Sequence, residues 1–336
     1  METIVGKQSI QFRKAPYIVS AASVVGKKEG EGPLGSQFDE IEKDPMAGQN
    51  TWEEAESALQ KRAATLAMDK MPTGLPPVRY LFSGDLLGQL IATSFGVMDL
   101  KLPLFGLYGA CSTIGEALML GAMTVQGGYS ETVLALTSSH FGSAEKQFRF
   151  PLEYGGQRPL AATWTVTGSG AFVLASKGGK ARISGVTPGK VVDYGLKDSL
   201  NMGACMAPAA CDTICQHLED FERQPSDYDY IITGDLGSVG QTILLDLAKE
   251  RGYDLSGCHL DCGMLIYDSD KQDTHAGGSG CACSAVTLAA HILPKIEKNQ
   301  WKRVLFVPTG ALLSTVSYNE GQSVPGIAHG VVIEHG

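Results

Sequence analysis

The chain has 336 residues, of which 43% are hydrophobic and 19% are charged, and its formal net charge at pH 7 is −9. This length allows one large α/β unit or two closely packed domains, and the composition is that of a globular protein, not a disordered one. The acidic balance argues against nucleic acid as the main partner, because phosphate binding needs clustered Lys and Arg.

The N-terminal stretch METIVGKQSI lacks the apolar core of a secretory signal, and no apolar run approaches the roughly 20 residues that span a bilayer. We therefore expect a soluble protein or one that is peripheral to a membrane. The eight cysteines lack the repeated CxxC pairs of a zinc site and stand mostly in Ala- and Gly-rich surroundings. They are predicted to be reduced, structural thiols, with no metal and no cofactor.

The predicted elements begin with residues 25–50, whose Gly, Pro and charged residues predict an extended surface loop. Residues 51–70 have apolar side chains at intervals of three or four and are predicted to form a helix, with Thr51 as N-cap and Glu54 completing a capping box. Beyond this helix, short β-branched runs alternate with Gly-rich turns and helical stretches. Such alternation is typical of an α/β protein with a largely parallel sheet.

Four features of the first half of the chain recur in the same order in the second half. They are the GDL motif at 84–86 and 234–236, the ACS motif at 110–112 and 282–284, a strand at 131–139 and 302–310, and a small-residue strand at 167–176 and 327–336. An ordered set of this kind indicates a duplicated architecture. We predict two α/β halves, residues 1–178 and 179–336.

The two helices that follow the ACS motifs are apolar on nearly every face, as a helix buried between layers must be. One such helix from each half predicts a central helical layer between two sheets, and thus a layered α-β-α-β-α sandwich. Pro294 is expected to kink or end the second helix.

Cys111 is the sharpest candidate for chemistry. It follows a short apolar strand and opens a helix, where the macrodipole and free N–H groups would stabilise a thiolate. A condensing enzyme activates its nucleophile in this way. Geometry alone leaves a second interpretation open, namely that a small residue is needed where the strand meets a buried helix.

The segment GACSTIGEALMLGAMTVQGG resembles the nucleophile region of thiolases and ketoacyl synthases, which consist of two duplicated halves, and this resemblance implies a thiolase-like fold. Those enzymes also use a His from a loop early in the second half, where this chain has Gly234 and Asp235. They take an Asn or a second His from a later Gly-rich loop, where it has Gly277 or Gly278, with His275 two residues early. We interpret Cys111 as a retained pocket residue and not a working nucleophile, so the chain is predicted not to be an enzyme.

A closer resemblance is to the stage V sporulation protein AD family. It rests on strings such as KEGEGPLGSQFD, TSSHFGSAEKQFRFPLEYGGQRP, MAPAACDTICQHLEDF, AGGSGCACSAV and GIAHGV, spread over the full length. The resemblance implies binding of dipicolinic acid (pyridine-2,6-dicarboxylate) or its calcium chelate, and a role in moving that compound into the developing spore. It also implies work alongside the membrane proteins of the same stage V sporulation A operon, in the spore cytoplasm at the periphery of the inner membrane. Proteins of the thiolase fold are generally homodimers, so we expect one here.

A planar dianion requires N–H donors, helix N-termini and fixed cations. Candidate ligand-binding residues are therefore Cys111, Ser112 and Thr113 at a helix start, Gly277, Gly278 and Ser279 in a loop with open amides, and His140, Arg149, Arg158 and Asp235. Each arginine could instead form a salt bridge, for example to Glu145 or Glu153, and His140 could cap a strand end. Asp235 stands near the missing catalytic His and could hold calcium through the ligand.

Two other functions remain open from the sequence. The first is an acyl-transferring enzyme of the thiolase or ketoacyl synthase type that uses Cys111, with His275 or His140 recruited as base. The second is a scaffold whose old pocket is filled by side chains.

Overall fold

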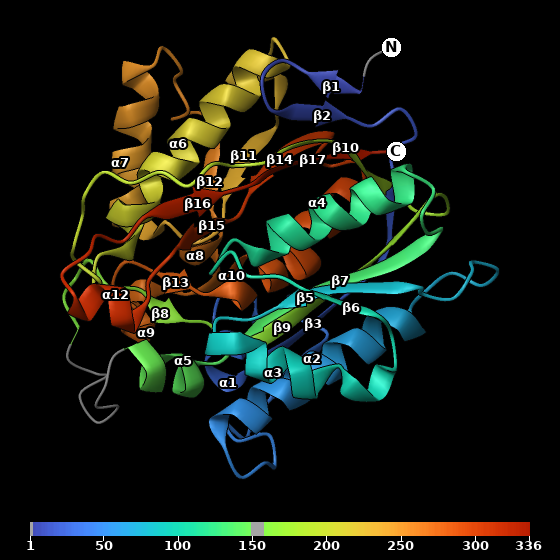
Figure 1. Ribbon diagram of the computed structural model, residues 1–336, viewed down its shortest axis with the longest axis horizontal. Helices are drawn as coiled ribbons and strands as arrows, with labels where there is room; N and C mark the ends of the chain where they lie inside the picture. Colours follow the sequence, from blue (N-terminus) through green and yellow to red (C-terminus); the bar gives the residue numbers. More distant parts are fainter. Residues whose placement is uncertain (1–2, 149–157) are drawn as a thin grey trace.

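The computed structural model describes residues 3–148 and 158–336. Helices cover the outer faces of two blocks of strands, and other helices lie between the blocks (Figure 1). The main strands of the first half are β3 (Tyr17–Gly26), β5 (Tyr80–Gly84), β6 (Leu104–Gly106), β7 (Thr132–Ser139) and β9 (Gly168–Ala175). Those of the second half are β10 (Ala181–Thr187), β11 (Tyr230–Thr233), β12 (His259–Asp261), β14 (Arg303–Val307) and β17 (Gly330–His335).

The longer helices are α2 (Trp52–Asp69), α4 (Thr113–Gln126), α5 (Phe141–Phe148), α6 (Met202–Asp220) and α7 (Gly237–Glu250). Shorter ones are α1 (Lys27–Gly30), α3 (Ile91–Gly96), α8 (Cys262–Ile266), α9 (Ser269–Gln272), α10 (Cys281–Thr287), α11 (Leu293–Glu297) and α12 (Thr315–Asn319). Short strands complete the fold: β1 (Ile4–Val5), β2 (Ser9–Gln11), β4 (Glu40–Glu42), β8 (Trp164–Thr165), β13 (Gly278–Ser279), β15 (Thr309–Ala311) and β16 (Gly326–Ala328).

The strand order displays the duplication. The first half runs β6-β5-β7-β9-β3 and the second runs β12-β11-β14-β17-β10, so equivalent strands occupy equivalent places. In each half the first three strands pair in parallel, and β9 or β17 pairs antiparallel with its neighbours on both sides. A short antiparallel pairing of Tyr17 and Ile18 with Arg182 and Ala181 joins the two blocks.

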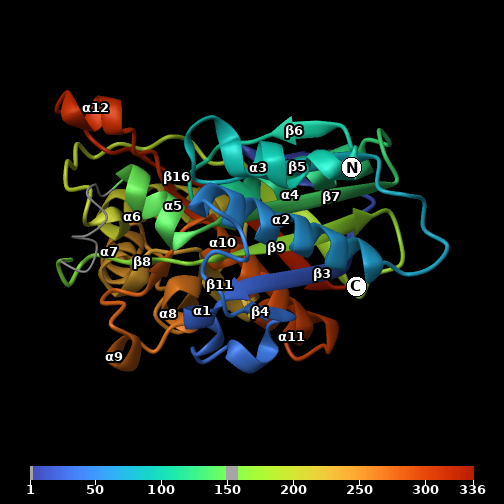
Figure 2. The ribbon, with the colours of Figure 1, turned by 90° about the horizontal axis from the view of Figure 1, so that it is seen from below.

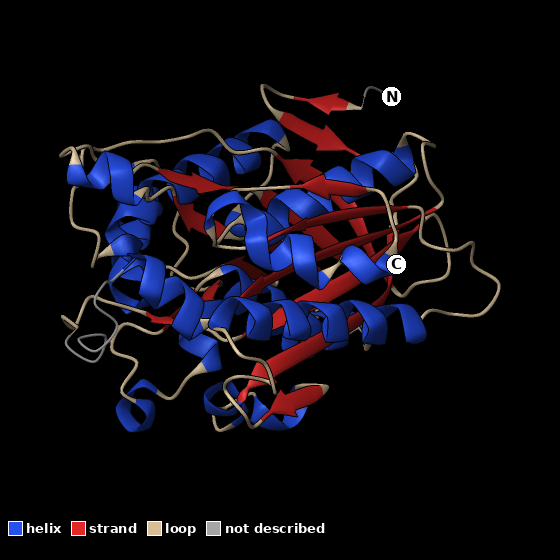
Figure 3. Cartoon of the chain, turned by 60° about the horizontal axis from the view of Figure 1, so that its bottom comes forward, coloured by secondary structure: helices blue, strands red, loops and turns tan. Residues whose placement is uncertain are grey.

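The helices form three layers around the two blocks of strands. Figures 1 and 2 show α4 and α10 in the centre, α6 and α7 over the block of the second half, and α2 and α3 over that of the first. Figure 3 shows the same alternation of helices and strands. This arrangement confirms the predicted α-β-α-β-α sandwich. It also explains why α4 and α10 are apolar on nearly every face, because both helices are buried between the two blocks of strands.

Local signals in the sequence account for two helices. The Thr51 hydroxyl accepts a hydrogen bond from the Glu54 amide and the Glu54 carboxylate accepts one from the Thr51 amide, so α2 begins with the predicted capping box. Pro294 lies in the first turn of α11, directly after a π-helical turn at Leu288–Ile292. The proline lacks an N–H donor, and the wider turn before it accommodates that loss.

The prediction of an extended loop at 25–50 was wrong in part. This segment contains the end of β3, helix α1 and strand β4, which pairs in parallel with β3. Arg62 of α2 forms ion pairs with Glu40 and Glu42, which fixes the strand against the helix. The pairing partners are distant in sequence, so the local composition could not reveal them. No helix in the described part of the chain is long and apolar enough to cross a membrane.

Candidate functional site

Cys111 lies in a tight turn between β6 and α4, and only 6% of its surface is exposed. Ala110, directly before it, has a φ of 50°, a left-handed conformation that is uncommon for a residue with a side chain. The neighbouring polar side chains are used to hold this turn: the Ser112 hydroxyl donates to the Gly109 carbonyl (2.7 Å) and the Thr113 hydroxyl donates to the Ala110 carbonyl (2.6 Å). The side chains of Ser112 and Thr113 therefore stabilise the turn, and the turn fixes the position of the Cys111 thiol.

The carboxyl group beside the thiol is that of Asp235, from the loop after β11. Its Oδ1 accepts a hydrogen bond from the Thr309 hydroxyl (2.7 Å), and its Oδ2 accepts one from the Gly280 amide (3.0 Å). Burial raises the pKa of Asp235 to about 7 in spite of these bonds. Asp235 thus links three loops of the second half at the point where Cys111 of the first half meets them.

Burial and this neighbour both act on the pKa of the thiol. Burial raises the pKa of Cys111 well above its usual value, and the nearby Asp235 carboxylate and the Cys281 thiol raise it further. A catalytic cysteine needs the opposite environment, because the thiolate is the nucleophile. Both effects favour the thiol of Cys111 over its thiolate.

Two glycines allow the halves to approach this closely. A side chain at Gly310 would lie 2.3 Å from the Gly109 carbonyl, on the turn that carries Cys111. Gly280 has a φ of +104°, and a side chain there would lie 2.7 Å from the Ser139 hydroxyl. Larger residues at either position would separate the second-half loops from the thiol.

The histidines that sequence analysis considered as bases lie elsewhere. His140 Nδ1 accepts a hydrogen bond from the Gly142 amide and its Nε2 contacts the Pro45 carbonyl (2.8 Å), so the ring is neutral with the proton on Nε2. His275 contacts the Pro159 carbonyl and Asp273. All seven histidines are within the described residues, and none forms a hydrogen bond with Cys111.

The remaining predicted site residues are divided between this centre and its surroundings. Ser279 lines the cavity at Cys111. The Gly277 amide donates to the Thr274 carbonyl, so this expected open amide is engaged within the protein, and Gly278 is part of β13, which pairs with β8. Arg158 donates to the Asp273 carbonyl (2.7 Å) and lies over the Trp164 ring, away from the thiol. Arg149 lies outside the described residues.

The cavity at Cys111 is small, about 30 Å³, which is room for about two water molecules. It lies between the halves, and its walls are mostly apolar. Those walls are formed by Leu86, Tyr108, Ala110, Cys111, Ala144, Glu145, Phe148, Thr165, Met202, Ser279, Ala311 and Leu313.

Sequence analysis missed the buried acid Glu56 and a second thiol, that of Cys281, near this cavity. Glu56 is fully buried between the hydroxyls of Ser138 and Ser143, and burial, together with nearby Asp85, raises its pKa to about 8. Cys281 donates through its sulfur to the Ala110 carbonyl (3.0 Å). No motif surrounds Glu56, which lies on a regular helix, so nothing in the sequence indicated its burial. The close spacing of Cys281 and Cys283 beside the Gly-rich loop could have indicated that Cys281 lies near the cavity.

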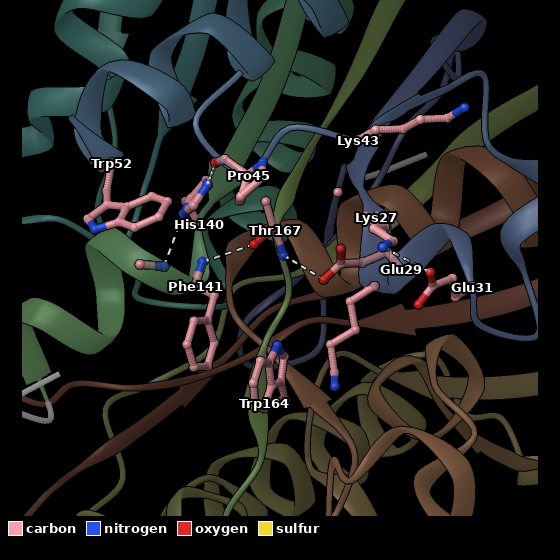
Figure 4. A pocket seen from close by; sticks show the side chains of 13 residues that line it. Lys27, Glu29, Glu31, Lys43, Pro45, Trp52, His140, Phe141, Trp164 and Thr167 are labelled. Carbon is pink, nitrogen blue, oxygen red and sulfur yellow. Dashed lines mark hydrogen bonds and ion pairs between the residues drawn. The ribbon is translucent and has the colours of Figure 1, made fainter. Parts of the chain in front are cut away.

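A second, larger hollow lies on the other side of β8 (Figure 4). Its volume is about 530 Å³, within the range of small-molecule sites. Trp52, Phe141 and Trp164 face it together with the segment that carries Lys27, Glu29 and Glu31. Of the predicted site residues that the structure describes, only His140 lines this hollow, which is called the aromatic cleft below.

Comparison with protein families identifies relatives along almost the whole chain. The model of the family described as Stage V sporulation protein AD matches residues 6–334. The stage V sporulation protein AD of Bacillus subtilis (strain 168) is 45% identical over 331 residues, which cover 98% of each chain.

Solved structures with the same architecture have low sequence identity to this chain. They include AbyA1, a tetronic acid condensing enzyme (17% identical, TM-score 0.57, 95% of this chain and 99% of that one). OleA of Xanthomonas campestris, solved with lauric acid and lauroyl-CoA, is 13% identical with a TM-score of 0.59, over 95% and 99% of the two chains. The 3-oxoacyl-(acyl carrier protein) synthase III of Pseudomonas aeruginosa is 12% identical with a TM-score of 0.57, over 95% and 98%. These matches confirm the thiolase-like fold.

The raised pKa of Asp235 predicts a pH dependence of stability. A carboxyl whose pKa rises from 3.8 to about 7 on folding stabilises the protein when protonated, and that stability is lost as pH rises toward 7. In Asp235→Asn this loss is absent, so its stability relative to wild type should increase between pH 4 and pH 8 by on the order of 2 to 4 kcal/mol. Urea unfolding across this range measures it. The exposed Asp246→Asn is the matched control, and parallel profiles for Asp235→Asn and wild type would contradict the assignment.

Proposed function

The chain belongs to the stage V sporulation protein AD family, and we propose that it binds dipicolinic acid, or its calcium chelate, without catalysing a reaction on it. The observation that carries the non-catalytic part is the carboxyl of Asp235 beside the Cys111 thiol, where a condensing enzyme would need a proton-accepting imidazole. The ligand itself is the one that the family resemblance implies.

Acyl transfer would fail here at two steps. The first needs a thiolate, and the pKa of Cys111 is raised by burial and by Asp235. The second needs donors aimed at the developing oxyanion, and loss of one such donor typically costs about 10² to 10³ in rate. The Gly280 amide, a possible donor, is bound to Asp235.

The chemistry around the cavity is compatible with a planar aromatic dicarboxylate. Tyr108 and Phe148 offer ring faces, and Leu86, Met202 and Leu313 offer apolar contact. The Cys111 thiol and a protonated Asp235 would both be neutral hydrogen-bond donors to a ligand carboxylate. Since the cavity has room for only about two water molecules, binding requires the partly exposed side chains of its wall, such as Phe148 and Met202, to move.

Calorimetric titration with dipicolinate tests this proposal. Wild type should show saturable binding, and Ala144→Leu, which fills the cavity from α5, should weaken it at least tenfold. Gln147→Leu places the same side chain on the exposed face of the same helix and should bind like wild type. Absence of saturable binding to folded wild type would sink the proposal.

Incubation with acyl-CoA and intact-mass measurement tests the competing acyltransferase hypothesis. We expect no adduct on wild type after hours at pH 7, because burial and Asp235 raise the pKa of the thiol and no described histidine forms a hydrogen bond with it. An acyl adduct that disappears in Cys111→Ser would overturn the non-catalytic assignment.

We further propose that the protein acts in the spore cytoplasm beside the membrane proteins of the same operon, at the periphery of the inner membrane. Membership of a sporulation family supports the first part. Exposed apolar side chains support a docking role. Val191 and Tyr194 are exposed on a segment that forms a bridge to Gly326 at the start of β16. Val316, also exposed, lies on α12, the helix that precedes β16 in the chain.

The proposed homodimer is supported by the edge strand β6. This strand ends the sheet with one side unpaired, and Phe105 on it is 50% exposed. Phe95 and Met98, just before it, are 60% and 62% exposed. An unpaired apolar edge of this kind is normally covered, and a second copy would cover it by pairing strand with strand.

Light scattering on purified protein tests the dimer. We expect a dimer for wild type and a shift to monomer for Phe105→Asp and Met98→Asp, because each buries a charge in the interface. Tyr129→Asp, at another exposed aromatic position, is the control. A monomeric wild type, or folded variants that remain dimeric, would contradict the proposal.

A further inference from the structure

The aromatic cleft contains a buried carboxylate oxygen that has no partner. Glu29 is 1% exposed, and its Oε1 accepts hydrogen bonds from the Thr167 amide (2.9 Å) and from the Tyr267 hydroxyl. Its Oε2 is buried and accepts no hydrogen bond within the described residues. Leaving such an atom without a donor costs free energy, so a ligand with an N–H group would be bound there.

The backbone beside this oxygen is shaped to leave it room. Gly26, at the end of β3, also lines the cleft, and a side chain on it would lie 2.7 Å from Glu29 Oε2. In Figure 4 the Glu29 carboxylate extends toward Thr167, and the rings of Trp52, Phe141 and Trp164 lie across the hollow from it. The oxygen therefore lies in the wall of the cleft, covered beside Gly26, and a ligand donor reaches it by a small movement of that wall.

The walls of the cleft are aromatic and partly exposed. Phe141 stacks on Trp164 with ring centroids 4.0 Å apart, and Trp52 packs against His140 at 5.4 Å. Partly exposed aromatic rings around a cavity of about 530 Å³ are typical of a site for an apolar or aromatic group.

A cation at the rim indicates the second charge of the ligand. The Lys28 ammonium lies 4.2 Å from the Trp164 ring centroid and donates to the Gln272 carbonyl (2.5 Å), which fixes it at the wall of the cleft. The lining also carries Lys27 and Lys43 beside Lys28, and Glu31 beside Glu29, so groups of both charges surround the cleft. A ligand that carries an ammonium and a carboxylate on one small apolar body satisfies both.

We propose that the aromatic cleft is a binding site for a free amino acid with an apolar or aromatic side chain, separate from the cavity at Cys111. Its ammonium donates to Glu29 Oε2, its carboxylate pairs with Lys28, and its side chain packs among Trp52, Phe141 and Trp164. The inference is independent of dipicolinate binding, because none of the described residues lines both hollows.

Calorimetry with three related probes tests this site. L-phenylalanine carries both charges, 3-phenylpropionate lacks the ammonium, and 2-phenylethylamine lacks the carboxylate. We expect saturable binding of L-phenylalanine and at least tenfold weaker binding of the two others. Equal binding of either truncated probe, or no binding of L-phenylalanine to folded wild type, would overturn the proposal.

Variants locate the site. Glu29→Gln keeps an oxygen for Thr167 and Tyr267 but places an amide N–H₂ group opposite the ligand ammonium, so it should weaken L-phenylalanine binding at least tenfold. Trp52→Leu removes a wall and should weaken it as well. The exposed Glu131→Gln undergoes the same chemical change far from the cleft and should bind like wild type. Unchanged binding in both cleft variants would refute the assignment.

Dipicolinate distinguishes this inference from the proposed function. Ala144→Leu should impair dipicolinate binding alone, and Glu29→Gln should impair L-phenylalanine binding alone. Competition between the two ligands for one site in wild type would show that the cleft is not a separate amino acid site.

Discussion

The contact between the Asp235 carboxyl and the Cys111 thiol is the constraint on which the chemistry of this protein depends. It is made where the two halves meet, and the same carboxyl is bonded to Thr309 and Gly280. The arrangement that in a condensing enzyme lowers the pKa of a thiol is here replaced by one that raises it. The cavity between the two halves thus holds the Cys111 sulfur beside a buried carboxyl group whose own pKa is raised to about 7.

The duplication allows the role of Asp235 to be compared with that of an equivalent residue, because each half has an aspartate after the equivalent strand. Asp85 follows β5, and its two oxygens accept hydrogen bonds from the amides of Leu87 and Thr93, so it organises the start of α3. Asp235 follows β11 and instead reaches across the second-half loops toward the thiol. The same residue at the same place in the repeat thus has a local structural role in one half and defines the site in the other.

Sequence patterns predicted the fold well, because the repeats, the capping box of α2 and the apolar helices after the ACS motifs are local or periodic signals. They predicted the site only in part. Cys111, Asp235 and Ser279 do come together, but Arg158 lies on Trp164 and His140 holds Pro45, and nothing in the sequence around either residue encodes such long-range partners.

The aromatic cleft was missed for the same reason. It combines Glu29, Trp52, His140 and Trp164 from four separate segments, which only the folded chain brings together. Strand β4 in the supposed loop at 25–50 also depends on a distant partner, Arg62. Long-range contacts of this kind become apparent only in the folded chain.

The central claim is tested most directly by titrating the Cys111 thiol itself. The absorbance of thiolate at about 240 nm, recorded against pH for wild type and for Cys111→Ser, isolates this one group among the eight cysteines as a difference curve. The account predicts a pKa for Cys111 well above the ordinary cysteine value of about 8.5. A Cys111 thiolate already formed at pH 7 would contradict it.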